Sequence, residues 1–138
     1  MTDYDSQDTE TRASHAGKST SERITDAMRS LPRDHFIEMS EPVRVQGRSI
    51  PPTNAVSEIL EHADPQPEHH VLQVGTGAGY VAALLSKLTQ QVVTLETNPV
   101  FARSAPERCN KLGLANLVLR AQDGSDGAAD LGPSERVL

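Results

Sequence analysis

Residues 71–80 read VLQVGTGAGY, in which a short apolar run meets three glycines within five positions. The run 71–74 is bounded by polar residues and by Gly75, which is typical of a strand buried on both faces. Helical spacing returns over 80–88, and 91–96 is a second β-rich run. A strand, a helix and a strand in this order predict a βαβ unit with parallel strands and a right-handed crossover.

Two helices are expected before this unit. The first helix is expected from Ser21, because Ile24, Ala27, Met28 and Leu31 recur at helical spacing. Pro32 then forbids a further turn. The stretch 41–53 is rich in proline and predicts an irregular loop. The second helix carries an apolar stripe with i, i+3, i+4, i+7 spacing, which needs a sheet or a helix to cover. The stripe consists of Val56, Ile59, Leu60 and Ala63.

A further helix is expected after the second strand. Asn98 and Pro99 are typical of an N-cap and a first-turn proline, and Gly113 is typical of a helix end. Pro106 lies inside this pattern and should kink the helix or divide it in two. Two more β-rich runs follow, 116–120 as a third strand and 136–138 as the beginning of a fourth.

Composition excludes several classes of protein. The 138 residues carry 19 acidic and 13 basic side chains without a Lys/Arg block, so nucleic acid is not an expected partner. No signal peptide and no apolar stretch of about 18 residues is present, so no membrane is expected. The single Cys109 cannot form a disulfide framework or a thiolate metal site, and His69 and His70 lack partner ligands. We therefore expect a cytoplasmic protein with no metal.

The chain divides at about residue 20. Residues 1–20 have almost no aliphatic side chains and predict a disordered polar tail. Residues 21–138 predict one cofactor-binding domain. Because the sequence stops on the first residues of a strand, we expect this domain to be incomplete at its C-terminus. The unpaired sheet edge then predicts self-association, or pairing with a downstream domain.

The glycines point to a nucleoside ligand. Gly75, Gly77 and Gly79 follow a strand and precede a helix, where glycine lets the backbone approach a ligand. The spacing is G-x-G-x-G, and Tyr80 stands where the dinucleotide fingerprint has its third glycine. This favours a cofactor without a pyrophosphate. A nicotinamide-binding domain is the least favoured alternative.

Acidic residues follow the next two strands. Glu96 ends the second strand about 20 residues beyond the loop, where a carboxylate can accept hydrogen bonds from two ribose hydroxyls. Asp123 and Gly124 follow the third strand. Each acid alone has an ordinary explanation, as a capping or solvated side chain or as part of a turn. Together with the glycine loop they predict one crevice at the carboxyl edge of the sheet.

Seven segments in the same order and spacing resemble a known family, the protein-L-isoaspartate O-methyltransferases, which are class I enzymes that use S-adenosyl-methionine. The resemblance covers roughly residues 24–138 and implies an α/β, Rossmann-like class I methyltransferase fold, here a truncated parallel sheet with flanking helices. The segments are LPRDHF (31–36), GRSI (47–50), VLQVGTGAGY (71–80), AALL (82–85), VTLE (93–96), LGLAN (112–116) and DGS (123–125).

By this resemblance, the chain carries the cofactor half of such an enzyme. The loop from Gly75 through Thr76 and Gly77 to Gly79 would hold the methionine part of S-adenosyl-methionine, Glu96 the ribose, and Asp123 with Gly124 the adenine edge. Gln73 stands where the family usually has an acidic residue. An acidic residue there would favour the ammonium group of the cofactor. A neutral amide forms a weaker hydrogen bond there.

The resemblance implies methyl esterification of isoaspartyl carboxylates in damaged proteins, a repair reaction. The nucleophile is already ionised at neutral pH, so alignment in a dry pocket can supply most of the rate without a general base. The family places a serine hydroxyl at the substrate carboxyl, where this chain continues into Pro51 and Pro52; Ser49 and Thr53 are the candidates to replace it. The alternative is a non-catalytic methyltransferase-like module, with a regulatory or interaction role, at the N-terminus of a larger protein.

Overall fold

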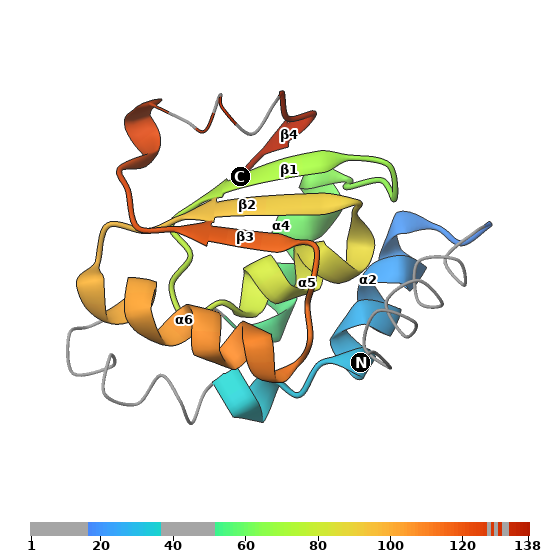
Figure 1. Ribbon diagram of the computed structural model, residues 1–138. Helices are drawn as coiled ribbons and strands as arrows, with labels where there is room; N and C mark the ends of the chain where they lie inside the picture. The colour runs from blue at the N-terminus through green and yellow to red at the C-terminus, as the bar shows by residue number, and fades with distance from the viewer. Residues whose placement is uncertain (1–16, 37–51, 127, 129, 131–132) are drawn as a thin grey trace.

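The computed structural model describes residues 17–36, 52–126, 128, 130 and 133–138. Within them, four parallel strands form one sheet in the order β3-β2-β1-β4 (Figure 1). Because β1 lies between β2 and β4, the loop that follows β1 opens at the centre of the carboxyl edge. The strands are β1 (His70–Val74), β2 (Gln91–Leu95), β3 (Leu117–Arg120) and β4 (Arg136–Val137).

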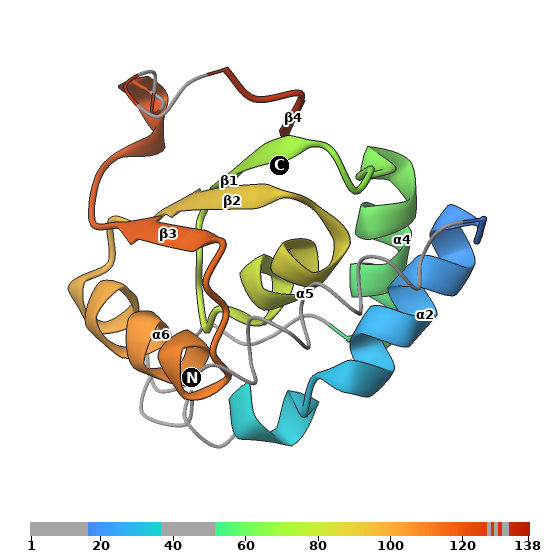
Figure 2. The same cartoon turned by 45° about the vertical axis from the view of Figure 1, so that its right-hand side comes forward.

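The longer described helices lie together on one face of the sheet, with α5 beneath its centre (Figures 1 and 2). They are α2 (Thr20–Ser30), α4 (Thr53–Ala63), α5 (Tyr80–Leu88) and α6 (Pro99–Lys111). The short 3-10 helix η1 (Gly124–Asp126) lies apart from them, at the end of β1. None of them combines the length and hydropathy of a membrane span. The β1–α5–β2 segment is the predicted parallel unit.

The core lies between the sheet and these helices. Val71 in β1 and Leu84, Leu85 and Leu88 in α5 are almost fully buried. The prediction that β1 is buried on both faces is wrong, because its residues alternate and Val74 is 47% exposed. Such alternation is expected where the described helices cover one face only.

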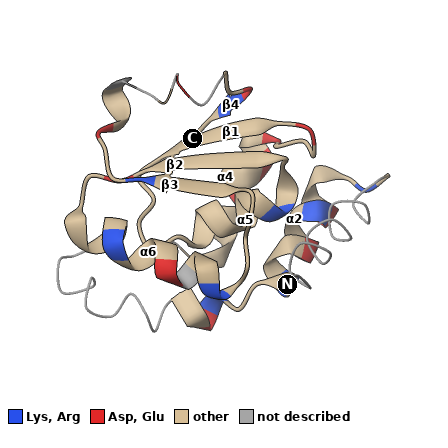
Figure 3. Ribbon diagram, in the orientation of Figure 1, with Lys and Arg blue, Asp and Glu red and all other residues tan. Residues whose placement is uncertain are grey.

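The described strands carry few charged residues. They are Arg120 and Arg136, and both lie at strand ends. Along α2 and α6, basic and acidic residues are interspersed (Figure 3). The described surface of these helices therefore shows no continuous basic face of the kind that binds nucleic acid.

The predicted helix ends are largely confirmed. The Asn98 side chain accepts from the backbone N–H groups of Val100 and Phe101, and Gly113 adopts a φ of 67° just after α6. Helix α2 begins one residue earlier than predicted, at Thr20. Residues 1–16 of the predicted tail and 41–51 of the predicted loop lie outside the described residues.

One helix prediction is narrowed and another is wrong. Helix α6 is one continuous element across Pro106, so it is not divided in two, and a kink at this residue stays a prediction. Pro106 can donate no hydrogen bond to the preceding turn, but the turns on either side keep their own bonds and the helix continues. Ile59 was expected in the covered stripe of α4 but is 48% exposed, because Val56 and Leu60 alone fill the contact with the core.

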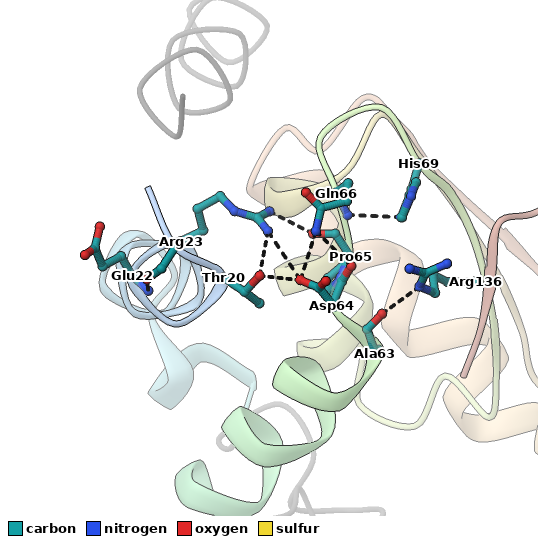
Figure 4. Close-up of polar contacts among 10 residues, drawn as sticks. Thr20, Glu22, Arg23, Ala63, Asp64, Pro65, Gln66, His69 and Arg136 are labelled. Atoms are coloured by element: carbon teal, nitrogen blue, oxygen red, sulfur yellow. Dashed lines mark hydrogen bonds and ion pairs between the residues drawn. The ribbon is translucent and has the colours of Figure 1, made fainter. Parts of the chain in front are cut away.

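Helix α2 is attached to the end of α4 through a buried arginine (Figure 4). Arg23 is 3% exposed, and its Nη1 donates to the carbonyl of Pro65 at 2.7 Å. Its Nη2 donates to Thr20 Oγ1 at 3.1 Å and lies 3.9 Å from Asp64 Oδ1. The Thr20 hydroxyl donates to the same carboxylate. A buried charge is thus matched by a carbonyl, a hydroxyl and a carboxylate.

Strand β4 also contacts the end of α4, through Arg136 (Figure 4). Arg136 Nε donates to the carbonyl of Ala63, in the last turn of α4, at 2.7 Å. Beside it, Glu135 Oε2 accepts from the backbone N–H of His70 at 2.7 Å, and this bond lowers the pKa of Glu135. Strand β4 lies at one edge of the described sheet, where pairing with another segment or a second copy stays a prediction.

Replacing Arg23 should test the α2 attachment. We expect Arg23→Met to lower the free energy of unfolding by about 1–3 kcal/mol, because the Pro65 carbonyl loses its donor inside the protein. Arg29→Met, on the exposed side of the same helix, should change it by less than about 0.5 kcal/mol. Urea unfolding of the two variants measures both values, and equal effects would contradict the assignment.

Candidate functional site

The glycine loop adopts a backbone that only glycine accommodates readily. Gly75, Gly77 and Gly79 have φ values of 88°, 57° and 97°. A Cβ at Gly79 would lie 3.4 Å from Cys109 Sγ and 3.5 Å from Ala105 Cβ, which is ordinary contact with α6, so it is the positive φ that favours glycine there. A Cβ at Gly75 or Gly77 would meet nothing within 4 Å. These two positions leave an open stretch of backbone that a ligand can approach.

The N–H groups of this loop are directed into the protein. Those of Gly75 and Thr76 donate to the Leu95 carbonyl at 2.8 and 3.3 Å, and that of Gly79 donates to the Thr76 carbonyl at 3.1 Å. The N–H of Gly77 donates to a side chain on the next strand end. A phosphate site requires N–H groups that point at the ligand. This loop uses four of its N–H groups internally and is poorly suited to hold a pyrophosphate.

Glu96 is the acceptor for Gly77. Its side chain is only 2% exposed, and Oε1 accepts from the Gly77 N–H at 2.9 Å. The other oxygen, Oε2, accepts from the Asn98 N–H at 2.8 Å. One carboxylate therefore joins the glycine loop to the turn that begins α6, as a charge-assisted contact on each oxygen.

A second buried contact lies beneath the loop. Thr76 Oγ1 is 2.6 Å from Thr94 Oγ1, and the Thr94 hydroxyl donates to Gln73 Oε1 at 2.9 Å. All three side chains are buried. Gln73 and Thr94 are direct partners in the β1–β2 register, so the strands themselves place them together. Sequence reasoning assigned no role to Thr94; the available signal was a hydroxyl within the apolar run VVTL.

A cavity of about 320 Å³ opens beside the loop. Its volume lies at the lower end of the range for small-molecule sites. Its walls are mostly apolar side chains and loop backbone, from Ile59, Gln73, Val74, Gly75, Thr76, Gly77, Ala78, Tyr80, Val81 and Leu138. Glu96, Asp123 and Gly124 are not among the lining residues. The candidate residues therefore fall into two groups. One group lines the cavity beside β1, and the other, Glu96, Asp123 and Gly124, follows the ends of β2 and β3.

Asp123 and Gly124 lie at the start of η1. Asp123 is exposed, and its carboxylate accepts from the Ser125 N–H at 2.8 Å, which lowers the pKa of Asp123. A Cβ on Gly124 would lie only 2.5 Å from Val74 Cγ1. The missing side chain of Gly124 thus lets η1 pack on the end of β1, next to the cavity.

Tyr80, the first residue of α5, contacts Arg33 and Phe36. The Arg33 guanidinium lies 5.2 Å from the centre of its ring, and the Phe36 ring is 5.4 Å away. Burial raises the pKa of Tyr80, and the nearby Arg33 charge offsets part of that shift. Phe36 is fully buried. The segment that precedes the loop region in sequence is thereby attached to the first turn of α5.

Of the two substrate-side candidates, the structure describes Thr53, which is not among the residues that line the cavity. Ser49 lies outside the described residues, as does Pro51. Thr53 is the first residue of α4 and is exposed there. Among the described residues, no group of three or more His, Cys, Asp and Glu side chains could hold a metal ion.

Two of the solved structures that share this fold bear the names of methyltransferases. The chain matches a protein-L-isoaspartate O-methyltransferase with a TM-score of 0.71 and 20% identity, over 95% of this chain and 47% of that one. It matches the precorrin-6Y C5,15-methyltransferase of Geobacter metallireducens with a TM-score of 0.59 and 22% identity, over 64% and 47% of the two chains. The fold is that of the class I methyltransferases, as predicted.

Sequence comparison narrows this class. The family model for protein-L-isoaspartate(D-aspartate) O-methyltransferase matches residues 9–138. The protein-L-isoaspartate O-methyltransferase of Koribacter versatilis is 36% identical over 126 residues, which is 85% of this chain and 57% of that relative. The chain belongs to the protein-L-isoaspartate O-methyltransferase family, and it spans little more than half the length of this relative.

The contact between Gly124 and Val74 gives a double-mutant test. Gly124→Ala should lower the free energy of unfolding by about 1–3 kcal/mol, because the added methyl group overlaps Val74. Val74→Ala should remove the overlap, so the double variant should be more stable than Gly124→Ala alone. Urea unfolding of the single and double variants checks this. Additive losses would show that the two residues do not meet.

The Asp123 contact gives a pH test. A carboxyl with a lowered folded pKa stabilises the folded state above its unfolded value, here 3.8, and this contribution is lost as the pH falls through the lower folded pKa. The amide resonance of Ser125 should therefore titrate with a midpoint below 3.8 in NMR spectra. The same resonance should lose this titration in Asp123→Ala. A midpoint at or above the unfolded value would contradict the contact.

Proposed function

We propose that this chain binds S-adenosyl-methionine and forms the cofactor half of an enzyme that methylates isoaspartyl carboxylates in damaged proteins. The observation that carries the proposal is the family match over residues 9–138. The geometry of the loop and of Glu96 supports it. We place the reaction in the cytoplasm, where the buried Cys109 stays a thiol.

The residues fit this cofactor better than a dinucleotide. The open backbone at Gly75 and Gly77 admits a close ligand, while the loop N–H groups are used inside the protein. The buried Glu96 carboxylate would repel a pyrophosphate but can accept from ribose hydroxyls. These features support a nucleoside cofactor without phosphate and argue against the nicotinamide alternative.

Each part of the site then has a role. Glu96 would hold the ribose, and Asp123 with Gly124 would border the adenine. Gln73 and the loop from Gly75 through Thr76 and Gly77 to Gly79 would surround the methionine part beside the apolar cavity. When bound, the cofactor supplies an electrophilic methyl group on a sulfonium.

The chain itself needs to supply no proton transfer for this reaction. An isoaspartyl carboxylate is ionised at neutral pH and is already a nucleophile. The apolar walls of the cavity, such as Val74 and Val81, would limit the access of water to a bound ligand, and alignment would be the protein's contribution. The partners are proteins or peptides that contain isoaspartyl residues.

A non-catalytic module of the same fold is the second candidate. The neutral Gln73 favours it, because that side chain supplies no charge opposite the cofactor's ammonium group. The prolines at 51 and 52, which stand where the family continues with a serine hydroxyl, favour it as well. In this alternative the chain keeps the fold and serves a regulatory or interaction role.

Calorimetric titration of S-adenosyl-homocysteine into the purified chain tests the cofactor assignment. We expect saturable binding, and we expect Glu96→Ala to weaken it by at least about tenfold, since bonds to a charged group are lost. Glu107→Ala, on the exposed face of α6, is the matched control and should bind like the wild type. A folded wild type that does not bind the ligand would contradict the proposal.

Transfer of a labelled methyl group to a peptide separates the two candidates. The enzyme should methylate an isoaspartyl peptide and leave the same peptide with an ordinary aspartyl residue unmodified. Binding of S-adenosyl-homocysteine without any transfer supports the non-catalytic module.

A further inference from the structure

Gln73 is a buried polar side chain at the wall of the cavity. It is 6% exposed, and it lies on β1 directly before the glycine loop. Its neighbours along the wall are Val74 and loop backbone. A carboxamide in this position offers one acceptor, Oε1, and one donor group, Nε2. Which of the two atoms is already used determines what Gln73 can recognise.

The hydroxyl protons of two threonines answer this question. Thr94 has one hydroxyl proton, which it donates to Gln73 Oε1 at 2.9 Å. The 2.6 Å contact between Thr76 and Thr94 must then use the proton of Thr76. The two bonds run in one direction, from Thr76 to Thr94 to the amide oxygen. They hold the Gln73 side chain with its oxygen turned toward β2.

The amide nitrogen is the remaining polar atom. Within the part of the chain that the structure describes, Gln73 Nε2 makes no hydrogen bond to the protein. Because the oxygen is turned toward Thr94, Nε2 is the group that Gln73 presents to the cavity. An NH₂ group only donates, so it matches a carboxylate, and it opposes an ammonium group, which also only donates.

We propose that Gln73 makes this site select for the carboxylate, and not for the ammonium group, of the amino-acid part of its ligand. The inference rests on the proposed function, because it assumes that an S-adenosyl amino acid occupies the cavity. A glutamate at this position would reverse the preference. Its carboxylate would accept from Thr94 on one oxygen and from the ligand's ammonium on the other.

Three thioether ligands test the selectivity without turnover. They are S-adenosyl-homocysteine, its analogue without the amino group (S-adenosyl-4-thiobutyrate) and its analogue without the carboxylate (S-adenosyl-3-thiopropylamine). In calorimetric titrations of the wild type, loss of the carboxylate should weaken binding about tenfold, the effect of one hydrogen bond to a charged group. Loss of the amino group should change it by less than about threefold.

In Gln73→Glu the preference should be reversed. Removal of the ligand's amino group should then weaken binding more than removal of its carboxylate. Thr94→Val is the second variant. It is close to isosteric and removes the donor that orients the amide, so it should reduce the difference between the two analogues while S-adenosyl-homocysteine still binds. The wild-type comparison needs neither variant to fold.

The outcomes separate this inference from the proposed function. If S-adenosyl-homocysteine binds and the wild type loses more affinity without the amino group than without the carboxylate, the amide is turned the other way. The selectivity inference is then wrong while the proposed function stands. If the folded chain binds none of the three ligands, the proposed function fails and the selectivity with it.

Discussion

The hydrogen bonds on the buried carboxylate of Glu96 are the contacts on which the site depends. The three glycines of the loop have no side chains with which to hold its shape, and all three adopt positive φ values. Glu96 receives the Gly77 N–H on one oxygen and the Asn98 N–H on the other. The end of β2 thereby positions both the loop and the start of α6. The contact costs desolvation of a charge, which two charge-assisted bonds offset.

Much of this architecture could be predicted from the sequence because the signals are local. A run of apolar residues followed by closely spaced glycines, an Asn-Pro pair and a glycine after a helix each constrain the backbone through one or two residues. They indicate βαβ order, the N-cap at Asn98 and the helix end at Gly113. The family resemblance rests on the same local segments, so the sequence alone predicts both the fold and the family.

The remaining features depend on tertiary contacts that a pattern cannot contain. The exposure of Ile59 follows from how α4 sits on the core, and the continuity of α6 across Pro106 depends on the turns on either side. The pairing of Gln73 with Thr94 appears only once the β1–β2 register is known. Asp123 and Gly124 were predicted as ligand contacts. The structure adds that Asp123 bonds to Ser125 and that Gly124 meets Val74.

The contact of Arg136 with Ala63 implies an order of events during folding. The two residues are 73 positions apart, and β4 pairs with a sheet whose other three described strands lie within residues 70–120. Closing this loop has a higher entropic cost than closing the shorter loops between the nearer strands. The nearer pairs, β1 with β2 and β2 with β3, can assemble first around α5. During synthesis, the end of α4 therefore leaves the ribosome long before Arg136, which donates to the Ala63 carbonyl there. Strand β4 can then pair with strands that are already assembled.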